Sequence, residues 1–194
     1  ALYDFQPSPR NTRLLYFCMM RMQQTETAYQ FLEAHIQSHP NDISSMMSLA
    51  EMQIPKSYDL AIATYNKALA VHEDNGIAQN NIAFLYLQQK KLDLARQHAE
   101  KAFALDKTNS DVLDTLGQIL LLQNEPKKAL EYLSAAVNGV NATKITDDVY
   151  INYVKALIVN EQYLLARDKI EAKTLPTKIV DELLALLPPE SDND

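Results

Sequence analysis

The sequence predicts an all-α fold: an α-α superhelix of about five helix–turn–helix repeats, followed by a C-terminal capping helix. Small residues recur at intervals of 33, 34, 34 and 37 positions, at Ala28, Ala61, Ala95, Ala129 and Ala166. A period near 34 is the length of one helix–turn–helix unit in an α-solenoid. Three glycines and no sustained alternation of apolar and polar residues argue against strands.

Further columns of residues keep the same period. Four positions after each alanine stand Leu32, Tyr65, Ala99, Leu133 and Ile170. About 13 positions before each alanine stand Leu15, Leu49, Ile82, Leu116 and Tyr153. Offsets of three and four place each set on one stripe of a helix, so every repeat is expected to contain two amphipathic helices.

The first two repeats are expected at 9–42 and 43–75. Helices near 11–23 and 26–38 form the first repeat, and Pro40-Asn41-Asp42 closes it and caps the next helix. In the second repeat Pro55 suits the first turn of a helix, where its missing N–H costs nothing.

The remaining repeats are expected at 76–109, 110–146 and 147–175. In the fourth, Asn124 is the expected cap of the second helix, and Pro126 lies near its first turn. Residues 138–143 add about three positions, which we expect to form a longer loop. Thr146 is the expected cap of the fifth repeat.

The two ends of the chain differ. A last helix at 176–187 should cover the final apolar surface, with one face formed by Ile179, Val180, Leu183, Leu184 and Leu187. Residues 188–194 are expected to be a disordered acidic tail. Residues 1–8 resemble the remnant of a preceding repeat or a linker, so we expect a longer solenoid upstream and a homodimer through this end.

The whole pattern resembles the tetratricopeptide repeat, most closely over residues 76–139. A small residue in the first helix of that repeat lets its two helices approach, and Ala50, Ala83 and Gly117 fit this position. Tyr16 and Val154 do not, so the outer repeats are divergent. The turn glycine of the family is absent, with Gln or Asn in its place.

Charge and composition exclude several classes of partner. A net charge of −7 argues against nucleic acid, because phosphate binding requires a basic stripe. No apolar run approaches the ~20 residues that a membrane-spanning helix needs. The single cysteine, Cys18, lies in an apolar run and is expected to be a small buried residue.

Catalysis finds little support in the sequence. His35 and His39 are four residues apart, but no third ligand is near, so a surface pair at the end of a helix is expected. The chain has no Gly-rich phosphate loop, no nucleophile elbow and no cluster of Cys and His. We therefore expect no enzyme activity, no metal and no cofactor.

The resemblance implies that a partner segment binds a concave face lined by the first helix of each repeat. In the register of the family this face comprises Arg13, Phe17, Met47, Asn80, Asn81, Phe84, Asp111, Asp114, Gln118, Asn152 and Lys155. Asparagine amides bind an extended backbone regardless of its side chains. The alternative, that Phe84, Leu87 and Leu121 simply pack between repeats, stays open.

Chaperone-binding repeats hold a carboxylate with a clamp of Lys, Arg and Asn. Asn81 matches one clamp position, but the positions that should be basic hold Met47, Asp111 and Thr115. Because Asp111 would repel a carboxylate, binding of chaperone tails is not expected.

The strings at 79–86 and 111–120 are similar to bacterial envelope lipoproteins with tetratricopeptide repeats, associated with exopolysaccharide export and PEP-CTERM sorting. This implies a protein–protein interaction scaffold in an envelope assembly, in the periplasm or attached to the envelope, with the cytoplasm as the alternative. The second hypothesis is a non-catalytic regulatory or targeting region of a larger enzyme, which the full reading frame would distinguish.

Overall fold

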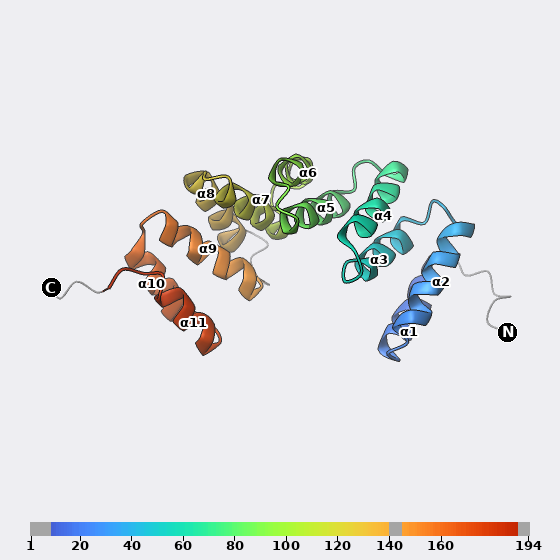
Figure 1. Cartoon of the computed structure of the whole chain (residues 1–194), viewed down its shortest axis with the longest axis horizontal. Coiled ribbons are helices and arrows are strands. Elements are labelled where there is room, and N and C mark those ends of the chain that lie inside the picture. The colour runs from blue at the N-terminus through green and yellow to red at the C-terminus, as the bar shows by residue number, and fades with distance from the viewer. Residues whose placement is uncertain (1–8, 140–144, 190–194) are drawn as a thin grey trace. The chain divides into compact units, whose positions relative to one another are not determined.

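A computed structural model describes residues 9–139 and 145–189, which are helical and contain no strand. The chain divides within one helix into two compact units, residues 1–85 and 86–194. The helices, drawn in Figure 1, are α1 Pro9–Arg21, α2 Thr25–Ser38, α3 Ile43–Gln53, α4 Tyr58–Val71, α5 Gly76–Gln88, α6 Leu92–Leu105, α7 Ser110–Leu122, α8 Pro126–Asn138, α9 Asp147–Val159, α10 Tyr163–Ala172 and α11 Thr177–Leu184.

The all-α repeat fold expected from the sequence is confirmed. The five alanines of the 34-residue ladder lie on the even-numbered helices α2 to α10, and each has an exposed fraction of 0%. The residues four positions later are also buried on the same helices. The sequence period therefore marks the faces through which the helices pack.

One core cluster of the first unit lies between α1, α2 and α3. Tyr29, Leu32 and Leu49 form its centre, and Tyr16 and Phe31 are among the partly buried side chains that pack against it. Tyr16, which is large where the family has a small residue, lies at the edge of this cluster. The expected divergence of this repeat thus coincides with a first helix that is only partly buried.

One buried polar pair connects α3 to α4 in the first unit. The Thr64 hydroxyl donates a hydrogen bond of 2.7 Å to Gln53 Oε1, and both residues are buried. Gln53 occupies a position that is apolar in the third, fourth and fifth repeats. The pair is tolerated there because each group satisfies the other's hydrogen-bonding capacity.

In the second unit, α7 and α8 approach each other closely at Gly117. A Cβ atom added at Gly117 of α7 would lie 2.3 Å from Leu133 Cγ of α8. Glycine is therefore required here by contact and not by backbone conformation. At the other end of the unit, Leu183 and Leu187 join the core together with partly buried Ile179, Val180 and Leu184, so the capping role expected of the last helix is confirmed.

Two of the predicted helix caps are confirmed and two predictions are wrong. Asp42 Oδ1 accepts a hydrogen bond from Ser45 N at 3.2 Å, and Thr146 Oγ1 accepts one from Val149 N at 3.4 Å. Pro55 lies in the turn before α4, whose cap is Ser57. Asn124 lies in the turn before α8, which begins at Pro126 with Glu125 at the cap position.

The turns inside four repeats share one backbone motif. Gln23, Lys90, Asn124 and Glu161 have φ between 58° and 61°, in the left-handed region. In each turn two backbone N–H groups close back onto the preceding helix, as in Lys90 N to Leu87 O at 2.9 Å and Lys91 N to Tyr86 O at 2.9 Å. This is the hydrogen-bonding pattern that ends many helices, where glycine is usual. Two of the four left-handed residues are Gln or Asn, as expected, and the other two are Lys and Glu.

Two sequence-based expectations for α1 and α2 are wrong. Cys18 is exposed, as are Leu14 and Phe17 on the same side of α1. His35 is buried, and its Nε2 lies 2.9 Å from Asp42 Oδ2. Burial alone would raise the pKa of Asp42, but hydrogen bonds from Ser45 and His35 outweigh it and lower that pKa.

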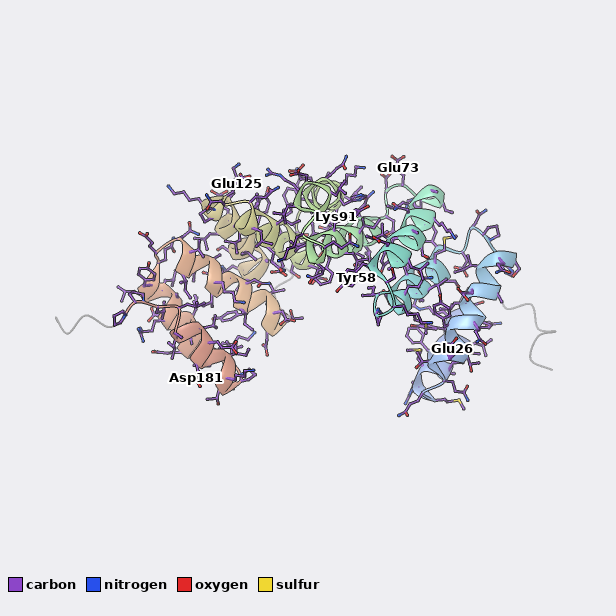
Figure 2. All side chains as sticks on the ribbon, viewed as in Figure 1. Glu26, Tyr58, Glu73, Lys91, Glu125 and Asp181 are labelled. Atoms are coloured by element: carbon purple, nitrogen blue, oxygen red, sulfur yellow. The ribbon has the colours of Figure 1, made fainter. Side chains whose placement is uncertain are left out.

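Three expectations fall outside the described residues: the remnant at 1–8, the extra loop residues at 140–144 and most of the acidic tail. Within the described residues, Glu73 and Asp181 point away from the ribbons (Figure 2). None of the described helices combines the length and hydropathy that crossing a membrane requires.

We expect Gly117→Ala to destabilise the protein by about 1–3 kcal/mol, because its methyl group must displace Leu133. In a Leu133→Ala background the same substitution should cost nothing, and the better helix propensity of alanine should give a gain of about 1 kcal/mol. Urea unfolding of the four proteins measures this coupling. An equal cost in both backgrounds would show that the contact with Leu133 is not the constraint.

Candidate partner-binding surface

The predicted binding residues come from the first helices of the repeats and fall into two sets, one in each unit. Residues of the first unit lie on α1, α3 and the first part of α5: Arg13, Phe17, Met47, Asn80, Asn81 and Phe84. Residues of the second unit lie on α7 and α9: Asp111, Asp114, Gln118, Asn152 and Lys155.

One face of α5 combines exposed apolar side chains with amides. Ile77, Asn80, Asn81 and Phe84 are spaced three and four residues apart, so they lie on one stripe of the helix. Ile77 is 64% exposed and Phe84 is 41% exposed, whereas Leu87 is buried. Packing between repeats therefore accounts for Leu87 but leaves much of Phe84 in solvent.

The two adjacent asparagines on this face have different roles. Asn81 Nδ2 donates a hydrogen bond of 3.0 Å to the Tyr65 hydroxyl, which connects α5 to α4. Burial, with the nearby Glu51 carboxylate, raises the pKa of Tyr65 to about 12, so it stays a neutral partner. Asn80 Oδ1, by contrast, is buried and has no hydrogen-bond partner among the described residues. A buried acceptor without a donor costs about 1–3 kcal/mol until a donor arrives.

The remaining residues of the first unit extend this apolar character. Phe17 is 48% exposed, and the Arg13 guanidinium lies 5.5 Å from the centre of its ring. Met47 is half-buried on α3, where its sulfur contacts the Asn75 amide at 3.9 Å. Burial raises the pKa of the Glu51 carboxyl on the same helix.

In the second unit, three of the predicted residues bind one another. Asp114 of α7 is 8% exposed and accepts hydrogen bonds from Gln118 Nε2 at 2.7 Å and from Asn152 Nδ2 at 3.0 Å. Because Asn152 lies on α9, the group joins two consecutive repeats. Burial raises the pKa of Asp114, and the charges of Asp111 and Asp148 raise it further.

Fewer of the predicted binding residues on α7 and α9 are exposed than expected. Asp111 and Lys155 are exposed, whereas the Asp114 carboxylate and the Asn152 amide are engaged in the scaffold. Thr115, at a clamp position, is buried and donates its hydroxyl to Asp111 O at 2.8 Å. Neither Asp111 nor Thr115 supplies the positive charge that a carboxylate clamp needs.

Metal binding has no basis in the described residues, where no three His, Cys, Asp or Glu side chains are placed to share an ion. His35 and His39 are not a surface pair: their rings stack with centroids 4.3 Å apart, and His35 is buried against Asp42.

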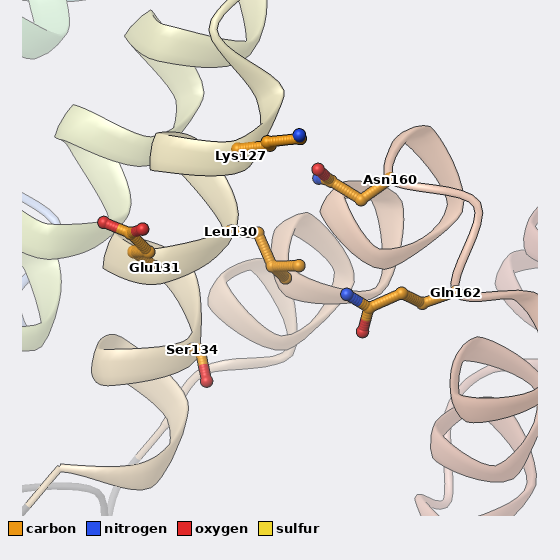
Figure 3. Close-up of a pocket in the computed structure, with 6 residues that line it drawn as sticks. All are labelled: Lys127, Leu130, Glu131, Ser134, Asn160 and Gln162. Atoms are coloured by element: carbon orange, nitrogen blue, oxygen red, sulfur yellow. The ribbon is translucent and has the colours of Figure 1, made fainter.

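A pocket that the sequence did not indicate lies in the second unit, and none of the first-helix residues that were expected to bind lines it. Its volume is about 450 Å³. It is formed by α8 and the turn between α9 and α10, and Figure 3 shows its lining: Lys127, Leu130, Glu131, Ser134, Asn160 and Gln162. Because α8 is the second helix of its repeat, a register that assigns binding to first helices does not indicate this pocket.

We expect Asp114→Asn to change the pH dependence of stability. Because burial raises the pKa of Asp114, the folded state binds its proton more tightly than the unfolded chain does. This stabilisation is complete below the unfolded pKa of about 3.9 and is lost as the pH rises through the folded pKa.

The free energy of unfolding of Asp114→Asn, relative to the wild type, should therefore improve as the pH rises from about 4 to about 7. Urea unfolding at a series of pH values measures it, and Asp168→Asn, at an exposed residue of α10 whose charge does not act on Asp114, controls for net charge. A difference that does not vary with pH would contradict this account.

Comparisons with known proteins agree with the repeat architecture. Residues 74–141 match the family model described as tetratricopeptide repeat. The STIP1 homolog of Dictyostelium discoideum is 30% identical over 126 residues, which are 61% of this chain and 22% of that protein. The chain thus spans about a fifth of the length of this relative.

Solved structures extend the likeness over most of the chain. The Cut9–Hcn1 hetero-tetramer of the APC/C contains a chain with 15% identity and a TM-score of 0.80, covering 95% of this chain and 38% of that one. YrrB, described as a tetratricopeptide protein with an unusual peptide-binding site, has 22% identity and a TM-score of 0.61, covering 78% and 74%. The fold is therefore that of tetratricopeptide-repeat proteins, with residues 74–141 matching the repeat family itself.

Proposed function

We propose that this protein is a non-catalytic interaction scaffold that binds a helix or extended segment of another protein through the exposed residues of its first helices. Repeat folds of this kind generally serve as such scaffolds, because stacked helices present extended binding surfaces. The observation that carries the proposal is the α5 face, where Ile77 and Phe84, 64% and 41% exposed, lie on one stripe of a first helix.

The chemistry of this face favours a segment with apolar side chains as ligand. Such side chains would cover Phe84 and Ile77, which the fold leaves exposed. The descriptions of YrrB, as a peptide-binding protein, and of Cut9–Hcn1, as a hetero-tetramer, support binding of this class.

The cellular setting is a finer proposal. A role in a bacterial envelope assembly, in the periplasm or at the envelope, is supported by the strings at 79–86 and 111–120, which are similar to envelope lipoproteins of exopolysaccharide systems. The cytoplasm is the alternative location.

A homodimer through the N-terminal end is also a proposal. Leu14 of α1 is 64% exposed, and Met22, in the turn that follows α1, is 66% exposed. Phe17 of α1 is 48% exposed. Uncovered apolar residues at this density are typical of contact surfaces.

We expect the double variant Ile77→Ser, Phe84→Ser to lose partner binding by at least about tenfold, since two apolar contacts together contribute about 2 kcal/mol. Affinity capture from the native organism with quantitative mass spectrometry measures the loss. The free protein should keep its helicity, because both side chains are exposed in the unbound fold.

Leu60→Ser is the matched control, because Leu60 is 42% exposed, like Phe84, but lies on the second helix of its repeat. Partners that depend on Phe84 and not on Leu60 support the first-helix surface. Capture that is unchanged in the double variant, or reduced equally in the control, would sink the assignment.

We expect Leu14→Glu to convert a homodimer to a monomer, because the carboxylate would be buried in an apolar contact. Light scattering after size-exclusion chromatography, over a series of concentrations, measures the mass. Leu164→Glu, at a residue 84% exposed on α10, is the control for added charge. A wild-type protein that is monomeric at every concentration refutes the dimer.

A further inference from the structure

The pocket on α8 presents groups that the fold itself does not use. Lys127 and Leu130 come from α8, Asn160 ends α9 and Gln162 precedes α10. Figure 3 shows the Lys127, Asn160 and Gln162 side chains extending toward one space, with Leu130 between them and the Glu131 carboxylate directed away. Its volume of about 450 Å³ is in the usual range for ligand sites.

Asn160 is held with its oxygen available. Its Nδ2 donates to Pro126 O at 2.8 Å and to Ala156 O at 2.7 Å, which occupies both amide hydrogens. These two bonds connect the end of α9 to the start of α8 and fix the orientation of the amide. Oδ1 is therefore a positioned acceptor.

The side chains of Lys127 and Gln162 are also available to bind a ligand. Within residues 9–139 and 145–189, neither the Lys127 ammonium nor the Gln162 side-chain amide has an ion-pair or hydrogen-bond partner. The adjacent Lys128, by contrast, is paired with Glu125. The pocket therefore contains one unpaired positive charge and one amide that both donates and accepts.

Lys127 stands at a position of the repeat that is acidic in the first three repeats. The position two residues before each alanine of the ladder holds Glu26, Asp59, Asp93, Lys127 and Leu164. An acidic residue is favoured in the first turn of a helix, because the helix dipole places partial positive charge there. Lysine at the same position is unfavourable for the helix itself, so the scaffold gives no reason for it.

We propose that this pocket binds an acidic side chain, Asp or Glu, carried by an extended segment of a partner protein. Lys127 pairs with the carboxylate, and the Gln162 amide donates a second hydrogen bond to it. Asn160 Oδ1 accepts a backbone N–H of the segment, and Leu130 packs against its aliphatic stem. The site is separate from the proposed first-helix surface, so each can fail without the other.

The test is a titration of the isotopically labelled protein with N-acetyl-glutamate N-methylamide, followed by NMR of the side-chain amides of Asn160 and Gln162. N-acetyl-glutamine N-methylamide is the neutral control ligand of the same shape. The glutamate compound should give saturable shifts at both amides, and the glutamine compound should bind at least about tenfold more weakly, since it loses the ion pair.

Two variants make the test specific. Lys127→Gln should weaken glutamate binding at least about tenfold, to the level of the neutral ligand. Lys128→Gln, with the same change in net charge one residue away, should leave it unchanged. Equal binding of the two ligands, or equal effects of the two variants, overturns the proposal, as do shifts spread over the surface that leave both amides unmoved.

Discussion

The close approach of paired helices is the constraint on which the other features of this chain depend. Five alanines with no exposed surface, one in each second helix, let the helices of each repeat pack closely, and the residues four positions on are buried with them. At Gly117 even a methyl group has no room beside Leu133. Because each pair is held this tightly, the helices are fixed as platforms on which exposed residues such as Phe84 and Lys127 are carried.

Polar contacts between repeats add connections that apolar packing does not provide. Asn152 reaches from α9 to Asp114 on α7, and Arg96 of α6 reaches Glu125 before α8 at 2.7 Å. The first connection is buried and the second is largely solvated, so the first contributes more to a unique arrangement of neighbouring repeats. Some residues that a family register assigns to ligand binding are thus already used to join repeats.

The fold could be predicted because every repeat packs its two helices in the same way. The buried alanines therefore recur in the sequence at the length of one repeat. The site could be predicted only by register, which places a residue on a face but says nothing about its neighbours. Register therefore could not separate Asn81, bound to Tyr65, from Asn80, whose oxygen lacks a partner. It also missed His35 and Cys18, because burial near the first repeat depends on which helix lies beside it. The α8 pocket could not be predicted from register, because it forms only where α8, the end of α9 and the start of α10 come together.

The four left-handed turns have a consequence for how such a chain can change over time. The turn is defined by two backbone hydrogen bonds, so Gln, Lys, Asn and Glu all serve, and no side chain is required for the geometry. Each non-glycine residue there carries a conformational cost of about 1 kcal/mol. The side chains at these positions can therefore change while the turn is kept. Replacing any one of them by glycine would remove its conformational cost and stabilise the fold. A mutation at a binding residue that weakens the fold could be offset by one glycine at a turn, far from the surface under selection.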